Sequence, residues 1–248
     1  MRIYLITGAG SGIGAAAARR LAGPGTGFAL ATRRNESGLA GLADELRAKG
    51  AVVATALGDA ADPASAGSLV ARALENFGRL DAVVACAGAA DRAALAELTR
   101  ERLGQSWSAM TAAFVDLARA ARAPLEASGQ GRLIAVSSFV ASLFRADLPA
   151  FPASSIAKAG LEAAVRALAL ELAPARITVN AVAPGFTRKD GARQGAMDPE
   201  RWRKIVERIP MGRLAEPAEI AETIAYLAGS ESGFVTGQIL RADGGLSL

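Results

Sequence analysis

The chain contains the glycine-rich run Thr7-Gly8-Ala9-Gly10-Ser11-Gly12-Ile13-Gly14 close to its N-terminus. It follows a short apolar run and precedes an alanine-rich run that begins at Ala15. Glycines allow a tight turn, and they let backbone N–H groups reach a pyrophosphate at the positive N-terminal end of the next helix. A strand, loop and helix in this order therefore predict a phosphate-binding cradle. Its candidate contact residues are Gly8, Ser11, Gly12, Ile13 and Gly14.

Outward from this loop, short β-branched runs alternate with longer runs in which apolar residues recur every three or four positions. This alternation predicts βαβ units around a parallel sheet. The expected strands are residues 3–7, 28–32, 52–57, 82–86, 132–137, 177–182 and 238–240, and the expected helices are residues 13–21, 39–49, 64–77, 103–127, 157–172 and 217–227. Right-handed crossovers then give one doubly wound α/β domain over residues 1–248, a Rossmann fold whose seven-stranded parallel sheet has helices on both faces.

Composition excludes several classes of function. The 248 residues carry a net charge of +4, but the basic residues are spread along the chain, so we expect no nucleic-acid partner. The absence of histidine excludes Ser-His-Asp catalysis, and a single cysteine, Cys86, excludes a cysteine cluster, so no metal site is predicted. No apolar run is long enough for a membrane span or a signal-peptide core, which predicts a cytoplasmic protein without a membrane partner.

Five motifs spread along the chain resemble those of the short-chain dehydrogenase/reductase family, in particular its members similar to 3-oxoacyl-(acyl carrier protein) reductase. The motifs are the glycine loop, Asp59-Ala60-Ala61-Asp62, Ala85-Cys86-Ala87-Gly88, Asn180 to Thr187, and Asp243-Gly244-Gly245. The resemblance implies a nicotinamide dinucleotide cofactor. It also implies that Asp59 lies near the adenine, although a turn residue is the alternative there. The remaining contacts that it implies are Ala87, Gly88, Pro184, Gly185 and Thr187, the last at the carboxamide.

The segment Ala31-Thr32-Arg33-Arg34 bears on the choice of cofactor. It has no carboxylate to bind the hydroxyls of the adenosine ribose, as a member that prefers NAD would have. Arg33 is positioned to pair with a 2′-phosphate, with Ser11 as an assisting hydroxyl donor. We therefore expect NADP(H) to be preferred over NAD(H), with a solvated arginine as the alternative reading of Arg33.

The catalytic segment departs from the family pattern. The family has a tyrosine that exchanges the proton, a lysine four residues later that binds the nicotinamide ribose, and a serine that orients the substrate oxygen. Here Lys158 matches the lysine and Ser138 the serine, but Ser154 stands at the tyrosine position. An alkyl hydroxyl is a far weaker acid than a phenol. Ala109 occupies the position of the family's relay asparagine. The candidate catalytic residues are Ser138, Ser154 and Lys158.

Two hypotheses follow from these departures. The first is an NADP(H)-dependent oxidoreductase of carbonyls or secondary alcohols, in which Ser154, water or the substrate itself handles the proton. The second is a catalytically silent subunit that partners an active paralogue. We expect the substrate to be a small molecule or an acyl thioester. The basic segment 188–193 could receive an anionic substrate of this kind, and a solvated loop is the alternative interpretation of that segment. Under both hypotheses we expect an oligomer, a homo-tetramer or a hetero-oligomer, packed through the helices at 103–127 and 157–172.

Overall fold

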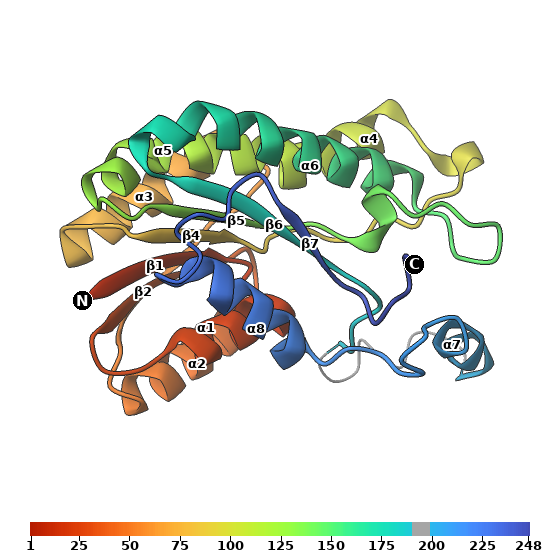
Figure 1. Ribbon diagram of the computed structural model, residues 1–248, viewed down its shortest axis with the longest axis horizontal. Coiled ribbons are helices and arrows are strands. Elements are labelled where there is room, and N and C mark those ends of the chain that lie inside the picture. The colour runs from red at the N-terminus through yellow and green to blue at the C-terminus, as the bar shows by residue number, and fades with distance from the viewer. Residues whose placement is uncertain (190–198) are drawn as a thin grey trace.

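The chain forms one seven-stranded parallel sheet in the order β3-β2-β1-β4-β5-β6-β7. The computed structural model describes residues 1–189 and 199–248. Every neighbouring pair of strands is parallel, so the carboxyl ends of all seven strands lie along one edge (Figure 1). The strands are β1 (Arg2–Thr7), β2 (Thr26–Thr32), β3 (Val52–Leu57), β4 (Ala82–Ala85), β5 (Arg132–Val136), β6 (Thr178–Pro184) and β7 (Ile239–Ala242).

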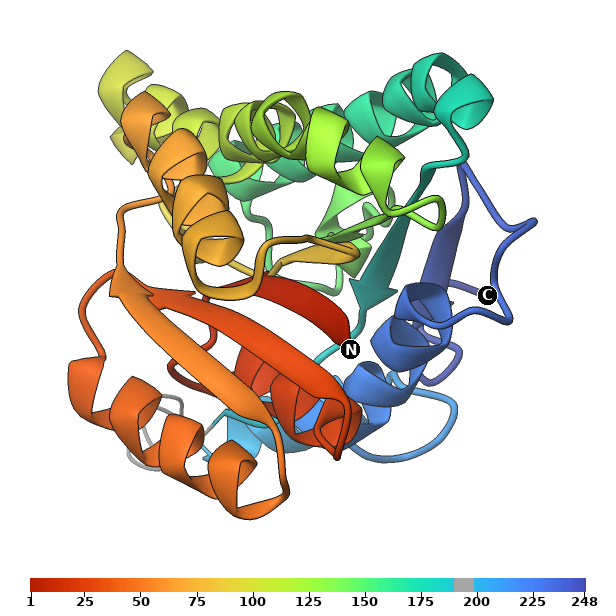
Figure 2. The same cartoon turned by 90° about the vertical axis from the view of Figure 1, so that its left-hand side faces the viewer.

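Helices cover both faces of the sheet, which confirms the predicted fold class. One face is packed by α3 (Pro63–Phe77), α5 (Ala113–Ala127) and α6 (Pro152–Leu172), with α4 (Arg100–Trp107) beside α6. The other face is packed by α1 (Gly12–Leu21), α2 (Glu36–Ala48) and α8 (Pro217–Ala228). Figures 1 and 2 show these two layers on either side of the strands. Each layer buries its own apolar cluster against the sheet, and this burial is the main stabilising term of the fold.

The predicted helix at 103–127 is wrong in one respect, because it is not continuous. It begins earlier as α4, passes through a π-helical turn at Ser108–Ala112, and continues as α5. A π turn closes i→i+5 hydrogen bonds and shifts the apolar positions by only one residue, so a pattern of three- and four-residue steps does not reveal it. The helix expected at 157 begins as α6 at Pro152, a residue type that suits the first helical position. Lys158 therefore lies in the second turn of α6, and it does not open the helix.

The structure also contains short helical segments that the sequence pattern did not predict. A helix α7 (Pro199–Val206) precedes α8, and single 3₁₀ turns lie at Leu95–Glu97, Phe139–Ala141 and Ala173–Ala175. Within residues 1–189 and 199–248, no helix has the length and apolarity needed to cross a membrane.

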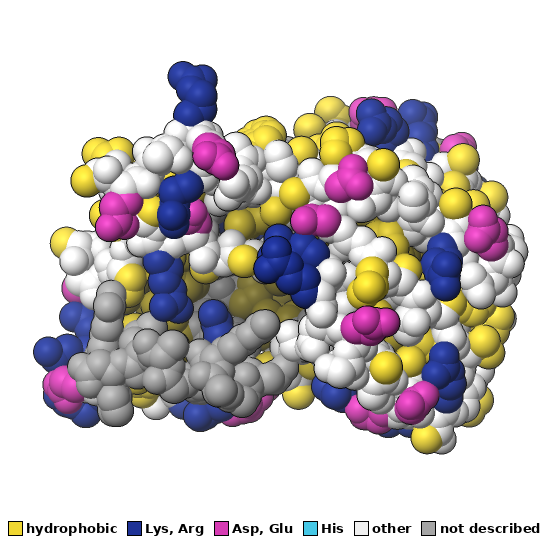
Figure 3. All heavy atoms as spheres, turned by 180° about the vertical axis from the view of Figure 1, so that it is seen from behind, with side chains coloured by type: hydrophobic (Ala, Val, Ile, Leu, Met, Phe, Trp, Pro, Cys, Tyr) yellow, Lys and Arg dark blue, Asp and Glu magenta, His cyan; other side chains and the backbone are white. Residues whose placement is uncertain are grey.

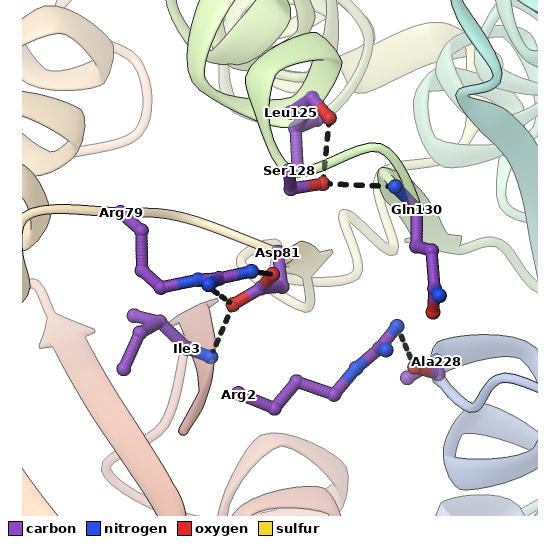
Figure 4. A network of polar contacts seen from close by, with 8 residues as sticks. All are labelled: Arg2, Ile3, Arg79, Asp81, Leu125, Ser128, Gln130 and Ala228. Carbon is purple, nitrogen blue, oxygen red and sulfur yellow. Dashed lines mark hydrogen bonds and ion pairs between the residues drawn. The ribbon is translucent and has the colours of Figure 1, made fainter.

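The amino ends of the strands are fastened by a polar network around a buried carboxylate (Figure 4). Asp81 accepts a hydrogen bond from the backbone N–H of Ile3 at 2.7 Å and pairs with the guanidinium of Arg79. Beside it, Arg2 donates to the carbonyl of Ala228 at the end of α8 at 2.8 Å. These bonds join β1, the start of β4 and α8. This edge is thus occupied by structural contacts, whereas the predicted site residues gather at the opposite edge.

Candidate nucleotide-binding and catalytic site

The glycine loop joins the carboxyl end of β1 to the N-terminus of α1. Gly8 and Gly12 adopt φ values of +67° and +58°, which favour glycine. A side chain at Gly14 would place its Cβ 2.5 Å from the carbonyl oxygen of Gly8, so glycine is what lets α1 begin directly on the loop.

The start of α1 fits a phosphate group. Ser11 is the N-cap residue, but its side chain makes no capping hydrogen bond, and the first turn has no acidic residue. A Cβ on Gly12 would meet no atom of residues 1–189 and 199–248 within 4 Å. Uncapped N–H groups at a helix N-terminus attract anions. The residues present therefore fit the pyrophosphate of a dinucleotide.

Arg33 and Asp59 come together at the carboxyl ends of β2 and β3. A guanidinium nitrogen of Arg33 lies 3.7 Å from a carboxylate oxygen of Asp59, and both side chains are exposed. Asp59 also accepts from the N–H of Ala61 at 3.0 Å, which is the geometry of a turn residue. Asp62 accepts from the N–H of Ala64 and caps α3. Arg33 is thus placed at the end of the sheet where an adenosine ribose would lie.

The segment after β4 lies against the glycine loop. The hydroxyl of Thr7 accepts a hydrogen bond from the N–H of Ala87 at 3.3 Å. A Cβ at Gly8 would be only 2.9 Å from that same nitrogen. Gly88 follows, and a Cβ there would lie 3.9 Å from the Nζ atom of Lys158. The cradle, the Ala87-Gly88 segment and Lys158 are therefore neighbours in space.

Lys158 carries a partly buried ammonium group at the carboxyl end of β5. Its Nζ donates to the carbonyl of Val136 at 2.6 Å. Desolvation lowers the pKa of Lys158 to about 8, and this outweighs the opposite effects of Cys86 and Glu162. Desolvation also raises the pKa of the Cys86 thiol to about 12, although the nearby Lys158 acts in the other direction. Burial therefore shifts both pKa values, but at neutral pH Lys158 remains mainly an ammonium and Cys86 remains a thiol.

A small cavity adjoins the ammonium group. Its volume is about 10 Å³, which is on the order of the space that one water molecule requires. Thr7, Ala87, Ala109 and Lys158 are among the residues that line it. Ala109 lies in the π-helical turn, and its short side chain leaves this space open. A polar group on Lys158 and a hydroxyl on Thr7 give a water molecule partners there.

The two candidate serines differ in their surroundings. Ser138 follows β5, and its hydroxyl accepts from the N–H of Val140 at 3.4 Å, where it caps the 3₁₀ turn. The buried hydroxyl of Ser154 instead accepts from the backbone N–H of Asp91 at 2.8 Å and reaches the carbonyl of the same residue at 3.4 Å. The structure therefore brings Ser138 and Lys158 to the end of β5 and turns Ser154 toward the loop after β4.

The segment after β6 closes the other side of the site. Pro184 ends β6, and a Cβ on Gly185 would lie 2.7 Å from the Cα of Asp243, so only glycine allows this approach. Thr187 donates to the carbonyl of Gly185 at 3.2 Å. In the basic segment, Arg188 pairs with Glu216 at 2.5 Å, and residues 190–193 lie outside the described part of the chain.

Three functional features were missed from the sequence. Asn35 binds the glycine loop, and the carboxylate of Asp91 pairs with Arg102 at 2.8 Å, which lowers the pKa of Asp91. Beyond Ser138, the ring centroids of Phe139 and Phe186 lie 4.5 Å apart, and Trp202 packs edge-on against Phe186. Asn35 precedes an expected helix, a position typical of a cap, so that signal was available. No local pattern marks the other two features.

Figure 3 shows a hollowed face with apolar side chains at its floor and basic side chains at its rim.

Comparisons with known proteins agree with this arrangement. Residues 8–247 match the family described as enoyl-(acyl carrier protein) reductase. An L-rhamnose 1-dehydrogenase (NAD(P)(+)) from Azotobacter vinelandii is 35% identical, with 99% of this chain and 96% of the relative covered. A 3-oxoacyl-(acyl carrier protein) reductase from Escherichia coli K12 is 32% identical, with 99% and 97% covered.

Solved structures give the same result. One is a putative NAD(P)-dependent gluconate 5-dehydrogenase from Beutenbergia cavernae, whose structure holds NADP at low occupancy. It is 31% identical and superposes with a TM-score of 0.89, and the match covers 99% of this chain and 96% of that one. A short-chain dehydrogenase/reductase from Serratia marcescens is 28% identical, with a TM-score of 0.91 and coverage of 100% and 98%. The match over nearly the whole chain and the shared fold establish that this protein belongs to the short-chain dehydrogenase/reductase family of oxidoreductases.

Proposed function

We propose that the protein is an NADP(H)-dependent oxidoreductase that interconverts a carbonyl and a secondary alcohol on a small molecule in the cytoplasm. One observation carries this proposal. The ammonium of Lys158 lies beside Gly88, at the same sheet edge as the start of α1, where the side chain of Ser11 makes no capping hydrogen bond. A cation and a phosphate cradle on one edge support a ligand that has both a pyrophosphate and a polar second half.

Each residue of the site has a proposed role. A bound nicotinamide dinucleotide supplies the hydride. The glycine loop binds its pyrophosphate, Asp59 lies near the adenine, and Lys158 donates to the ribose. Ser138 orients the substrate oxygen. The Ser154 hydroxyl is bonded to Asp91. In the reductive direction the substrate oxygen therefore takes a proton from a water molecule that the cavity beside Lys158 can hold, and the Lys158 ammonium returns a proton to the hydroxide that is left. General acid catalysis typically contributes about 10² to 10⁴ in rate, so turnover without a phenol is expected to be slow.

The preference for NADP(H) rests on Arg33. Its guanidinium is exposed, and its partner Asp59 is 3.7 Å away, so the arginine can turn to a 2′-phosphate. An exposed ion pair of this kind contributes little stability, so breaking it costs little. Substitution of Arg33 by Ala should weaken NADPH binding about tenfold and leave NADH binding almost unchanged. Equal affinities of the wild-type protein for NADPH and NADH would refute the preference.

The experiment that tests the function is a fluorescence titration with NADPH and NADH, followed by oxidation of the bound NADPH against a panel of carbonyl compounds. The relatives suggest the panel. It should contain a sugar lactone or ketose, 4-oxocyclohexanecarboxylate and a 3-oxoacyl thioester. The second compound is the ketone that corresponds to the alcohol in the name of another relative, a cis-4-hydroxycyclohexanecarboxylate dehydrogenase. Binding with turnover supports the reductase. No binding of either nucleotide refutes the cofactor assignment.

One observation favours a second function, that of a catalytically silent subunit. The hydroxyl at the tyrosine position is bonded to the backbone of Asp91 and is not free to exchange a proton with a substrate. Apolar side chains are exposed on α4, α5 and α6, the helices expected to pack between subunits. These are Trp107, Val115, Ile156 and Leu170. Two results together would establish this alternative. The protein would bind nucleotide without turnover, and sedimentation would show a monomer that assembles only when an active paralogue is added.

A further inference from the structure

We propose that Asn35 is a positioning residue of the nucleotide site, one that holds the glycine loop in the shape that receives a pyrophosphate. The inference rests on the proposed nucleotide binding. Asn35 lies between β2 and α2, outside every motif identified in the sequence. Its Nδ2 donates to the carbonyl of Gly10 at 2.6 Å, while its Oδ1 accepts from the N–H of Gly38 at 3.2 Å and caps α2. One amide group therefore joins the loop to the next helix.

The packing around this amide is tight. A Cβ on Gly10 would lie 2.8 Å from the hydroxyl oxygen of Thr32 and 3.1 Å from the Cβ of Asn35. A Cβ on Gly38 would lie 2.4 Å from the Nδ2 of Asn35 and 2.5 Å from the carbonyl oxygen of Gly10. Side chains do not fit at either glycine. The loop, the β2–α2 turn and the first turn of α2 are thus in direct contact.

The geometry of the peptide bond explains why this contact matters for binding. In a trans peptide the C=O and the following N–H point in opposite directions. Fixing the carbonyl of Gly10 toward Asn35 therefore turns the N–H of Ser11 away from Asn35. That N–H donates no hydrogen bond to any residue within 1–189 and 199–248. It is left for a ligand, at the helix end where a phosphate is favoured.

Two contacts at this end of the sheet should then have separable effects. Asn35 acts on the loop that receives the pyrophosphate, which NADPH and NADH share. Arg33 faces the position of the 2′-phosphate, which only NADPH has. Loss of the Asn35 bond should weaken both nucleotides by the same factor, and loss of Arg33 should weaken one.

The test uses Asn35→Ser in the full-length protein. Serine caps a helix as well as asparagine, but it lacks the amide donor that reaches Gly10. We expect the dissociation constants of both NADPH and NADH, measured by calorimetry, to rise about 3- to 10-fold, the range for loss of one hydrogen bond. Adenosine 2′-monophosphate has no pyrophosphate, so its affinity should stay within about twofold of the wild-type value. The midpoint of thermal unfolding should stay within about 2 °C of the wild-type value. The Arg33→Ala variant should show the converse pattern, with adenosine 2′-monophosphate and NADPH weakened.

The outcomes separate the two proposals. Absence of nucleotide binding in the wild-type protein overturns the proposed function itself. If Asn35→Ser binds NADPH and NADH as the wild-type protein does, only the role of Asn35 is overturned. The same conclusion follows if Asn35→Ser loses as much affinity for adenosine 2′-monophosphate as for the dinucleotides, because that result would show a disturbed β2–α2 turn. If Asn35→Ser folds poorly, Asn35→Asp provides the second variant, because it keeps the cap while its carboxylate repels the carbonyl of Gly10. Binding of both dinucleotides must then fall, or the inference is wrong.

Discussion

The hydroxyl of Ser154 accepts a hydrogen bond from the backbone N–H of Asp91 at 2.8 Å, although Ser154 stands four residues before the lysine of the site. Asp91 in turn pairs through its carboxylate with Arg102 on α4. The position at which the family resemblance predicts a tyrosine thus anchors the loop after β4. A residue buried in this way has a structural partner that must be displaced before it can serve a substrate.

We expect that Ser154→Tyr does not restore carbonyl reduction. Ser154 is only 4% exposed, so a phenol ring has to displace the Asp91 segment, at a cost of about 1–3 kcal/mol in the free energy of unfolding. Ser154→Ala should cost about 1 kcal/mol by leaving the Asp91 N–H without its acceptor. Urea unfolding and NADPH oxidation measure both effects, with Ser155→Ala as the neighbouring control. A Ser154→Tyr protein that is stable and reduces carbonyls tenfold faster would contradict this account.

Lys158 should give the protein a distinctive dependence of stability on pH. Desolvation lowers the pKa of Lys158 from 10.5 to about 8. Between about pH 8 and pH 10.5 the unfolded chain therefore binds more protons at this residue than the folded chain does. Lys158 therefore makes the free energy of unfolding rise with pH in that window. Below about pH 8 the lysine is charged in both states, and the full cost of burying its charge lowers the stability of the folded protein.

The comparison that isolates this effect is Lys158→Met against the wild-type protein, measured by urea unfolding from pH 7 to pH 10.5. The burial that raises the pKa of Cys86 to about 12 gives a slope of opposite sign above pH 9, but Cys86 is present in both proteins. The stability of the wild-type protein should therefore rise relative to that of Lys158→Met as pH increases. Parallel curves for the two proteins would show that Lys158 titrates as it does in water.

Gly160 is in close contact with an aromatic side chain. It lies in α6, and a Cβ there would be 2.5 Å from the ring of Trp107 at the end of α4. Gly160→Ala must displace the indole of Trp107 from its place against α6, so it should lower the free energy of unfolding by about 1–3 kcal/mol. Gly67 in α3 is the matched control, because a Cβ there meets nothing within 4 Å. Gly67→Ala should raise stability by up to about 1 kcal/mol through helix propensity. Thermal and urea unfolding compare the two variants.

The buried carboxylate of Asp81 should be a large contributor to stability at the amino edge of the sheet. Asp81→Ala leaves the N–H of Ile3 and the guanidinium of Arg79 without their acceptor, at an expected cost of about 1–3 kcal/mol. Asp44→Ala removes an exposed ion pair with Arg47 and should change stability by less than about 0.5 kcal/mol. Similar unfolding midpoints for these two variants would refute a special role for Asp81.

Much of the architecture could be predicted from local patterns in the chain. All seven expected strands lie within two residues of the observed ones at each end, since β-branched runs and their flanking glycine, proline and aspartate are local signals. The π-helical turn at Ser108–Ala112 was not predicted, because it shifts the apolar pattern by only one residue. The start of α6 was placed five residues late, although Pro152 is a local signal for the first helical position. The expectation of a single domain over residues 1–248 stays a prediction.

Local patterns in the chain are enough to give the order of the elements and the glycine loop, and they predict which residues stand at the catalytic positions. The hydrogen bonds that engage the side chains of those residues appear only in the folded protein. Ser154 and Asp91 are 63 residues apart, and Asn35 and Gly10 are 25 apart, yet each pair is joined by a hydrogen bond. Hydrogen bonds between distant residues depend on how parallel strands bring their carboxyl ends to one edge, and no short-range pattern in the chain records that meeting.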